Sequence, residues 1–363
     1  MRYVLIALIL FHGLIHLMGF SKAFGYAALK QLSLPVSKPA GLLWLLATVF
    51  FLTAVILIAL SSRYWTPVLI TACVLSQLLI ILSWKEARFG TLVNIVLLAI
   101  AILSLTSQYF EQTFKKEAFE LLRQPDPAKG QLLTEADTRH LPEIVQRYLQ
   151  YSGVMNRPKV YNMRVVFDGQ MREKGKSFFS FSSEQYNFFE NPARLFFIKA
   201  AMYGIMVPGY HHYRDATARM DIRLFGEIPV VRESGTVMDT TETVTLFNDM
   251  CLLAPATLID PRINWIYADT LSVWAEFLHE GIRIRALLSF NEKGQLVNFI
   301  SQDRTAIADR KKYPFSTPVK KYRQLNGYNL MSEADAVWDY PDGKFVYGKF
   351  RLRDIQYNYK EPD

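Results

Sequence analysis

The chain has 363 residues, of which 51% are hydrophobic, a mean hydropathy of +0.09 and a formal net charge of +8. Residues 1–107 contain seven Lys or Arg and one acid, and the remainder contains 34 and 32, so the charge gives no sign of a nucleic-acid-binding face. The only two cysteines, Cys73 and Cys251, exclude a disulfide scaffold and a cysteine-rich metal site.

Four apolar runs of about 18 to 20 residues open the chain, close to the ~20 residues that a helix needs to cross a bilayer. Glu86 is the only acidic residue between Tyr3 and Ser107. A water-soluble fold has too few surfaces to bury four such helices in succession. We therefore predict a four-helix transmembrane domain over residues 1–107, with the spans Tyr3–Phe20, Gly41–Leu60, Thr66–Ser83 and Gly90–Ser107.

The basic residues between the spans favour one orientation. Five of them lie in the first and third connections: Lys22, Lys30, Lys38, Lys85 and Arg88. Two lie on the other side, with a further pair just beyond span four: Arg2, Arg63, Lys115 and Lys116. Because positive loops tend to stay in the cytoplasm, we expect a bacterial inner-membrane protein whose C-terminal domain is extracytoplasmic.

Two histidines, His12 and His16, lie four residues apart in the first span and share one helix face. One interpretation is a haem or metal pair, because ionisable groups at membrane depth are costly and often functional. The other is a pair of neutral imidazoles that bond to neighbouring helices, which the small Gly13 allows to approach closely. We favour the second and expect no cofactor. Gln77 and Asn94 are expected to form interhelical hydrogen bonds too.

Residues 108–130 are predicted to be a juxtamembrane helix, Gln108–Arg123, followed by a linker with two prolines and a glycine. A β-rich soluble domain over residues 131–363 follows. Its first element is an amphipathic helix, Leu141–Gly153, with Pro142 in the first turn and Gly153 as C-cap.

Beyond this helix the hydrophobic period changes from 3.6 to 2, which predicts strands. We expect about ten of them: Lys159–Phe167, Ser177–Glu184, Arg194–Ala201, Ala216–Phe225, Pro229–Val237, Trp265–Ala268, Leu271–His279, Ile282–Phe290, Val297–Thr305, Val319–Leu325 and Lys344–Tyr359. A hairpin turn with Gly294 joins two of them. One helix, Thr240–Ala254, interrupts the strands, and Asp239 with Glu242 forms a capping-box pattern at its start.

The fold class predicted for the soluble domain is α+β, with a large curled antiparallel sheet and a few helices. A sheet of about ten strands tends to curl, and a curled sheet lined by aromatic residues tends to enclose an apolar cavity.

Four segments resemble an uncharacterised bacterial family of the DUF6544/DUF6920 type: Leu141–Leu149, Glu184–Phe189, Asn191–Leu195 and Thr245–Cys251. The resemblance covers about residues 130–360 and implies no activity or catalytic residue. In strand and helix order the domain is also similar to LolA/LolB-type lipoprotein carriers, incomplete β-barrels with helices in the opening, which is an analogy of fold alone.

No Walker loop, nucleophile elbow, dinucleotide fingerprint or zinc-protease motif occurs in the chain. His211 and His212 are adjacent, so on a strand they point to opposite faces and cannot share a metal. A site at either would need partners such as Asp215 or Glu184. A polar strand end or loop is the plainer interpretation.

A second candidate set consists of acids and an arginine near the expected cavity. Phe247, Asn248 and Asp249 lie on the inserted helix, and Asp303 and Arg304 on a late strand. They could hold a polar headgroup or act as acid and base. A structural pairing of helix and sheet is the plainer interpretation. The candidate ligand-binding residues are Phe247, Asn248, Asp249, Arg304 and Glu184, and the catalytic ones are Asp249, Asp303, His211 and His212.

The leading hypothesis is a multi-pass membrane protein whose β domain binds a hydrophobic or lipid-like ligand. One alternative is an envelope hydrolase with a His/Asp site, and another is a structural tethered domain without a ligand. The expected partners are the bilayer and a lipid-like molecule, without nucleic acid.

Overall fold

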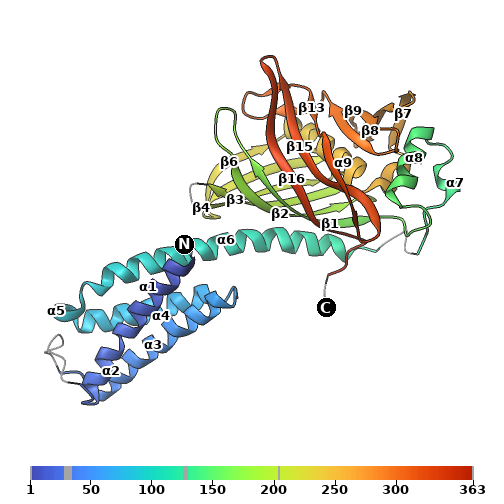
Figure 1. Cartoon of the computed structure of the whole chain (residues 1–363). Coiled ribbons are helices and arrows are strands. Elements are labelled where there is room, and N and C mark those ends of the chain that lie inside the picture. Colours follow the sequence, from blue (N-terminus) through green and yellow to red (C-terminus); the bar gives the residue numbers. More distant parts are fainter. Residues whose placement is uncertain (1, 28–34, 126–129, 203–204, 362–363) are drawn as a thin grey trace. The chain divides into compact units, whose positions relative to one another are not determined.

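The computed structural model describes residues 2–27, 35–125, 130–202 and 205–361 (Figure 1). The chain divides into two compact units, which are described separately. The first extends to Phe110 and includes Phe225–Glu227, and the second comprises Glu111–Leu224 and the residues from Ile228 onward. Lys30 in the first connection and residues 126–129 of the expected linker lie outside the described residues.

The first unit is helical, as the apolar runs predict. Within the described residues, four helical segments have the length and composition to cross a membrane: Arg2–Ala23, Lys38–Ala59, Trp65–Leu82 and Gly90–Leu122. The first consists of α1 (Arg2–Ile15) and α2 (Leu17–Ala23), and the others are α3, α4 and α6, with the short α5 (Trp84–Ala87) before α6. The expected juxtamembrane helix is therefore the continuation of α6, without a break after the apolar residues.

Polar side chains join three of these helices. His12 on α1 bonds Asn94 on α6 (Nε2 to Oδ1, 2.9 Å), and His16 bonds Ser76 on α4 (Nε2 to Oγ, 2.8 Å). Asn94 also donates to Ser76 (2.9 Å) and to Gln77 (3.1 Å). The histidines thus have the interhelical partners that the second interpretation expects. No cluster of three or more metal-ligating side chains occurs in the described ranges.

Gly13 brings α1 close to α3. A Cβ added at this glycine would lie 2.6 Å from the Cβ of Phe51, and the Gly13 carbonyl accepts a hydrogen bond from the Thr48 hydroxyl (3.1 Å). Small residues at such crossings allow the backbone-to-backbone approach on which membrane helix packing depends.

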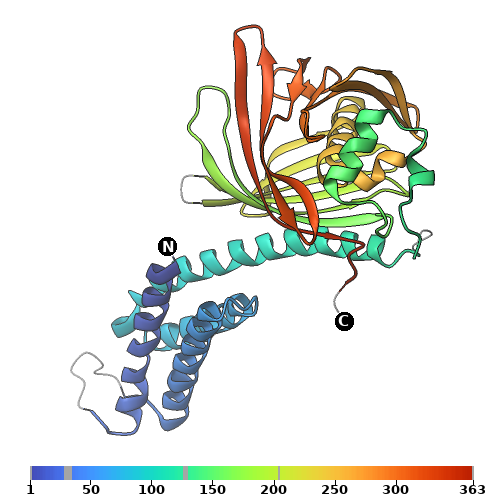
Figure 2. The same ribbon diagram turned by 45° about the vertical axis from the view of Figure 1, so that its right-hand side comes forward.

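The second unit is built on one curled antiparallel sheet with an open edge at each end (Figure 2). Its path runs β6-β5-β4-β3-β2-β1-β16-β15-β13-β10-β9-β8-β7, and β14 pairs with β15. The longer strands are β1 (Asn162–Met171), β2 (Phe179–Phe188), β3 (Ala193–Met202), β4 (Ile205–Arg214), β5 (Thr217–Leu224), β6 (Ile228–Ser234), β7 (Ile263–Ala268), β8 (Ser272–His279), β9 (Ile282–Phe290), β10 (Leu296–Ser301), β14 (Val319–Leu325), β15 (Tyr328–Tyr340) and β16 (Gly343–Tyr357). β13 (Phe315–Ser316) is a short strand of this sheet, and β11 (Thr305–Ala306) and β12 (Lys311–Lys312) pair in a separate two-stranded sheet.

Two of the longer strands differ from the sequence-based expectation. β4 occupies residues for which a polar strand end or loop was the plainer interpretation, and the long β15 was not predicted. Both are central in the sheet, since β4 pairs with β3 and β5 and β15 pairs with β16. The predicted hairpin turn between β9 and β10 is confirmed, with Gly294 at φ +78°.

Helix α9 (Thr236–Leu253) lies within the curve of the sheet, and α8 (Glu143–Ser152) packs at its C-terminal end (Figure 2). Tyr148 on α8 donates a hydrogen bond to the Cys251 carbonyl on α9 (2.8 Å). Most α9 side chains are buried on all sides of the helix, and Phe247 stacks on Phe277 at 5.3 Å. The short α7 (Glu135–Thr138) precedes α8, and the 3-10 turn η1 (Pro255–Ile259) follows α9.

The opposite face of the sheet is covered by the C-terminal part of α6. Phe114 is fully buried there, with its ring 5.3–5.7 Å from those of Tyr186, Phe197 and Tyr210. Sheet residues thus alternate between the inner face toward α9 and the outer face toward α6.

We expect Asn94→Ala to destabilise the helical unit by about 2 kcal/mol, because it removes three interhelical hydrogen bonds of roughly 0.6 kcal/mol each in a membrane setting. The control is Thr53→Ala, whose hydroxyl, among the described residues, donates to the Val49 carbonyl of its own helix. Unfolding of the full chain by sodium dodecyl sulfate in mixed micelles measures both. Equal losses in the two variants would contradict the role of the Asn94 network.

Candidate functional site

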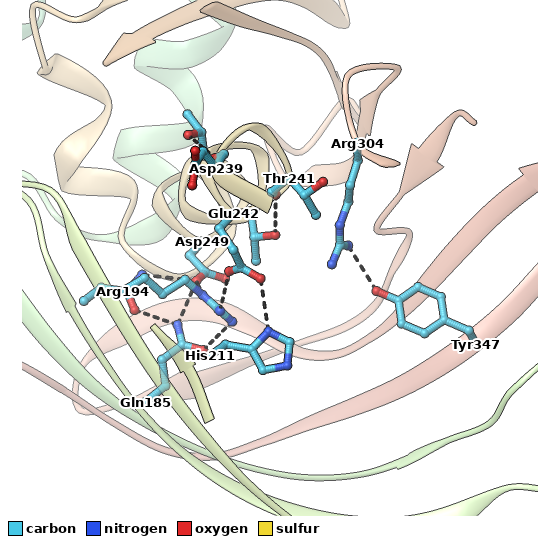
Figure 3. Close-up of polar contacts among 12 residues, drawn as sticks. Gln185, Arg194, His211, Asp239, Thr241, Glu242, Asp249, Arg304 and Tyr347 are labelled. Carbon is cyan, nitrogen blue, oxygen red and sulfur yellow. Dashed lines mark hydrogen bonds and ion pairs between the residues drawn. The ribbon is translucent and has the colours of Figure 1, made fainter. Parts of the chain in front are cut away.

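A buried polar cluster joins α9 to the inner face of the sheet (Figure 3). The sheet contributes Gln185 and Asn187 from β2, Arg194 from β3 and His211 from β4. Helix α9 contributes Glu242 and Asp249, which are seven residues apart and so lie on the same side of the helix. We call these six residues the inner polar cluster.

Arg194 is the centre of the inner polar cluster. Its Nε donates to Asp249 Oδ2 (2.7 Å), Nη1 to Glu242 Oε2 (3.0 Å) and Nη2 to Gln185 Oε1 (3.0 Å). The side chains of Arg194, Glu242 and Asp249 are 8%, 3% and 12% exposed, so solvent screens these charges weakly. Asp249 Oδ2 also accepts from Gln185 (2.7 Å) and Asn187 (3.1 Å). Each nitrogen of this guanidinium therefore has an acceptor.

Glu242 is ionised across the physiological range. Burial opposes its charge, but the Arg194 guanidinium, the hydrogen bond with His211 and the field of Arg304 together lower the pKa of Glu242 to about 2. The distance from His211 Nδ1 to Glu242 Oε1 is 3.1 Å. Glu242 therefore serves as a fixed negative charge beside two arginines.

Arg304 and Tyr347 lie beside this cluster on the same side of α9 (Figure 3). Arg304 Nη1 donates to the Tyr347 hydroxyl (3.0 Å). Thr305, the next residue, donates its backbone N–H to the Thr241 hydroxyl on α9 (3.3 Å), which places Arg304 near Glu242. Tyr347 is the extra residue of a β-bulge, because Ala336 pairs with Gly348 while Val337 pairs with Val346. Bulges re-aim side chains in this manner.

The inner face changes from polar to apolar along the strands. The row across β2, β3 and β4 that contains Arg194 also contains Asn187 and Tyr213. Two cross-strand rows further along β3, toward its C-terminal end, are mainly apolar. One contains Ser183, Ile198, Gly209 and Ile222, and the next contains Phe181, Ala200 and Val207. Since alternate residues of a strand share a face, one surface carries the charges beside α9 and the apolar side chains beyond them.

Comparison with known proteins assigns a family to this domain. A model of the family of unknown function DUF6544 matches residues 131–350, more than half of the chain. The chain belongs to the DUF6544 family. Among curated proteins, none matches the sequence.

Two solved structures resemble parts of this DUF6544 protein. One is a domain from Vibrio parahaemolyticus described as an outer membrane lipoprotein-sorting protein, at 10% identity and TM-score 0.35, covering 59% of this chain and 91% of that chain. The other is a β-barrel-like protein of the DUF1849 domain from Brucella abortus, at 8% identity and TM-score 0.17, covering 55% and 98%.

The two adjacent histidines of the DUF6544 domain point to opposite faces of β4, as their spacing predicts. His211 contacts Glu242 on the inner face, and His212 Nε2 lies 3.3 Å from Glu117 of α6 on the outer face. The partners considered from sequence lie elsewhere. Glu184 is an outer-face residue that accepts from Arg164 Nε (2.7 Å), and Asp215 lies beside Arg214 (3.3 Å).

The remaining candidates do not converge on one centre. Phe247 is buried in the core, and Asn248 donates to the Thr317 hydroxyl (2.9 Å). Asp303 accepts the backbone N–H of Arg285 (2.8 Å), whereas Asp249 belongs to the inner polar cluster. Asp249, considered together with Asp303 and Arg304 from the sequence, thus pairs with Arg194, while Asp303 and Arg304 have other hydrogen-bond partners.

Sequence reasoning overlooked Arg194 and Gln185 as site residues. A signal existed, because Arg194 is the one charged residue in the apolar run from Ala193 to Ile198. The capping-box interpretation of Glu242 was wrong. The α9 N-cap is Gly235, Asp239 accepts the Ala218 backbone N–H (2.7 Å), and Glu242 instead binds Arg194.

We expect Glu242→Gln to lower the free energy of unfolding by about 3–5 kcal/mol, since it removes one partner of a buried ion pair. The control is Glu333→Gln, whose exposed pair with Lys321 is worth under about 1 kcal/mol. Urea unfolding of the detergent-solubilised full chain measures both. Similar losses in the two variants would contradict the burial argument.

A comparison of wild type with Glu242→Gln at several pH values tests the pH dependence of this contribution. Because the folded pKa of Glu242, about 2, is below its ordinary value of 4.5, its stabilising effect is complete above about pH 4.5 and is lost as the pH falls toward 2. The stability difference between wild type and Glu242→Gln should therefore shrink over that interval. A difference that is constant between pH 6 and pH 3 would show that the carboxylate charge is not responsible.

Proposed function

We propose that this DUF6544 protein is a multi-pass membrane protein whose half-barrel domain binds a hydrophobic or lipid-like ligand on its inner face. The observation that carries the proposal is the polar-to-apolar change along β2, β3 and β4. An amphiphile has the same two-part character, so its apolar portion fits the rows with Ile198 and Ile222. Its polar portion fits the end near α9.

Partly exposed apolar residues support this assignment. Met220 pairs with His211 and so shares the inner face, and Ile222 pairs with Gly209 two residues further along. Phe350 contacts the rings of Phe167 and Phe181 on the same side. Met220, Ile222 and Phe350 each keep some solvent exposure. Burial of this apolar area by an acyl chain would contribute roughly 25 cal/mol per Å² to the binding free energy.

The membrane location is proposed from the four apolar helices. The excess of Lys and Arg in the first and third connections supports a cytoplasmic location for those loops and an extracytoplasmic half-barrel at a bacterial inner membrane. A domain tethered in this way meets lipids and lipid-linked molecules at the bilayer surface.

A pair of isoleucine variants tests the binding proposal. Ile222→Asp places a carboxylate on the inner face, and Ile228→Asp places one at a position that is 55% exposed on the neighbouring edge strand. The purified full-length proteins are passed over a sizing column in detergent, and the retained lipids are quantified by mass spectrometry.

We expect wild type and Ile228→Asp to retain the same lipid in near-stoichiometric amount. Ile222→Asp should retain at least about tenfold less, because a charge against an apolar chain costs more than ~1.4 kcal/mol. Lipid bound only around the membrane helices would be unaffected by either change. Equal retention by all three proteins would therefore contradict the proposed function.

A further inference from the structure

Arg304 has unused hydrogen-bonding capacity on the inner face. A guanidinium has five N–H donors, and the Nη1 bond to Tyr347 is the hydrogen bond that Arg304 forms within the described residues. Its Nε is buried and has no partner among them. An unsatisfied buried donor is rare in folded proteins and calls for an explanation such as a bound group.

The arginine is nevertheless held in place. Its guanidinium stacks over the rings of Phe315, at 4.1 Å, and Trp338, at 5.5 Å. The hydroxyl of Tyr347, which the β-bulge directs inward, accepts a hydrogen bond from Nη1 of this guanidinium. Stacking and a single hydrogen bond orient the group and leave its other N–H donors without a hydrogen-bond partner among the described residues, which is the arrangement of a preorganised anion receptor.

Of the two arginines near α9, only Arg194 has direct carboxylate partners among the described residues. Arg194 is matched by Glu242 and Asp249 at ion-pair distance. Within the described part of the chain, no carboxylate oxygen lies within 4.0 Å of a guanidinium nitrogen of Arg304. Glu242 and Asp249 are both hydrogen-bonded to Arg194, whereas Arg304 acts on Glu242 through its field and not through a direct bond. His211 also lies beside Glu242, with Nδ1 3.1 Å from Oε1. Its Nε2 has no hydrogen-bond partner among the described residues.

We propose that Arg304, with Tyr347 and His211 beside it, binds the anionic headgroup of an amphiphile whose apolar chain lies along the inner face toward Ile222. The recognised group is a carboxylate or a phosphate, which accepts paired N–H bonds from a guanidinium fork. This inference rests on the proposed function and names the class of its ligand.

The experiment measures equilibrium binding to the full chain in phosphatidylcholine nanodiscs, with binding to empty nanodiscs subtracted. The radiolabelled probes are palmitate, lysophosphatidic acid, the uncharged hexadecanol and inorganic phosphate alone. The variants are Arg304→Gln and the conservative Arg304→Lys. The control is Arg353→Gln, whose side chain is 59% exposed and pairs with Asp168 at 2.7 Å on the outer face.

We expect the wild type and Arg353→Gln to bind palmitate or lysophosphatidic acid about 10- to 100-fold more tightly than hexadecanol, the range that hydrogen bonds to a charged group supply. Arg304→Gln should lose that preference while its hexadecanol affinity is unchanged. Arg304→Lys should retain part of the preference for the charged probes, because lysine keeps the positive charge but lacks the paired N–H donors of a guanidinium.

Other results would overturn the inference. If Arg304→Gln keeps the preference for the charged probes, the arginine is not the headgroup receptor, and the proposed binding of a lipid-like ligand still stands. If inorganic phosphate binds as tightly as lysophosphatidic acid, the site takes a free anion and the amphiphile is wrong. If the wild type binds none of the three amphiphiles, the proposed function itself fails.

Discussion

One guanidinium, that of Arg194, fixes helix α9 inside the curled sheet. It bonds two carboxylates that lie two turns apart on α9, and these contacts set both the rotation of the helix and its position along the strands. Removing these charges from water costs several kcal/mol, and the ion pairs and hydrogen bonds of the network offset that cost. Its effect is to turn the polar stripe of α9 toward β2, β3 and β4.

The remaining features of the inner face depend on that placement. With α9 rotated in this way, Glu242 faces Arg304 and His211, and the bulge at Tyr347 supplies the hydroxyl that orients Arg304. Beyond the helix the strands continue with small and apolar residues. The domain therefore presents one surface with a charged end and an apolar end, and the proposed amphiphilic ligand rests on this arrangement.

Local signals in the sequence accounted for the membrane-length helices, α8 and the turn at Gly294, because apolar length, capping and turn chemistry are encoded within a few residues. β4 was not recognised because Pro208 and Gly209, residues that ordinarily mark turns, lie in its middle, and only its pairing with β3 and β5 makes it a strand. The site was harder still to predict from the sequence. Asp249 and Arg304 were named as candidates, but their partners come from strands far away in the chain, and spacing along a sequence does not reveal such pairings.

Photo-crosslinking with a diazirine-labelled palmitate tests the central claim most directly. With the full chain in nanodiscs and the adducts mapped by peptide mass spectrometry, we predict modification of inner-face residues of β3, β4, β5 and β16, such as Ile198, Met220 and Phe350. Adducts confined to the four apolar helices, or to the outer face around Tyr186, would contradict the claim that the half-barrel holds a lipid-like chain beside α9.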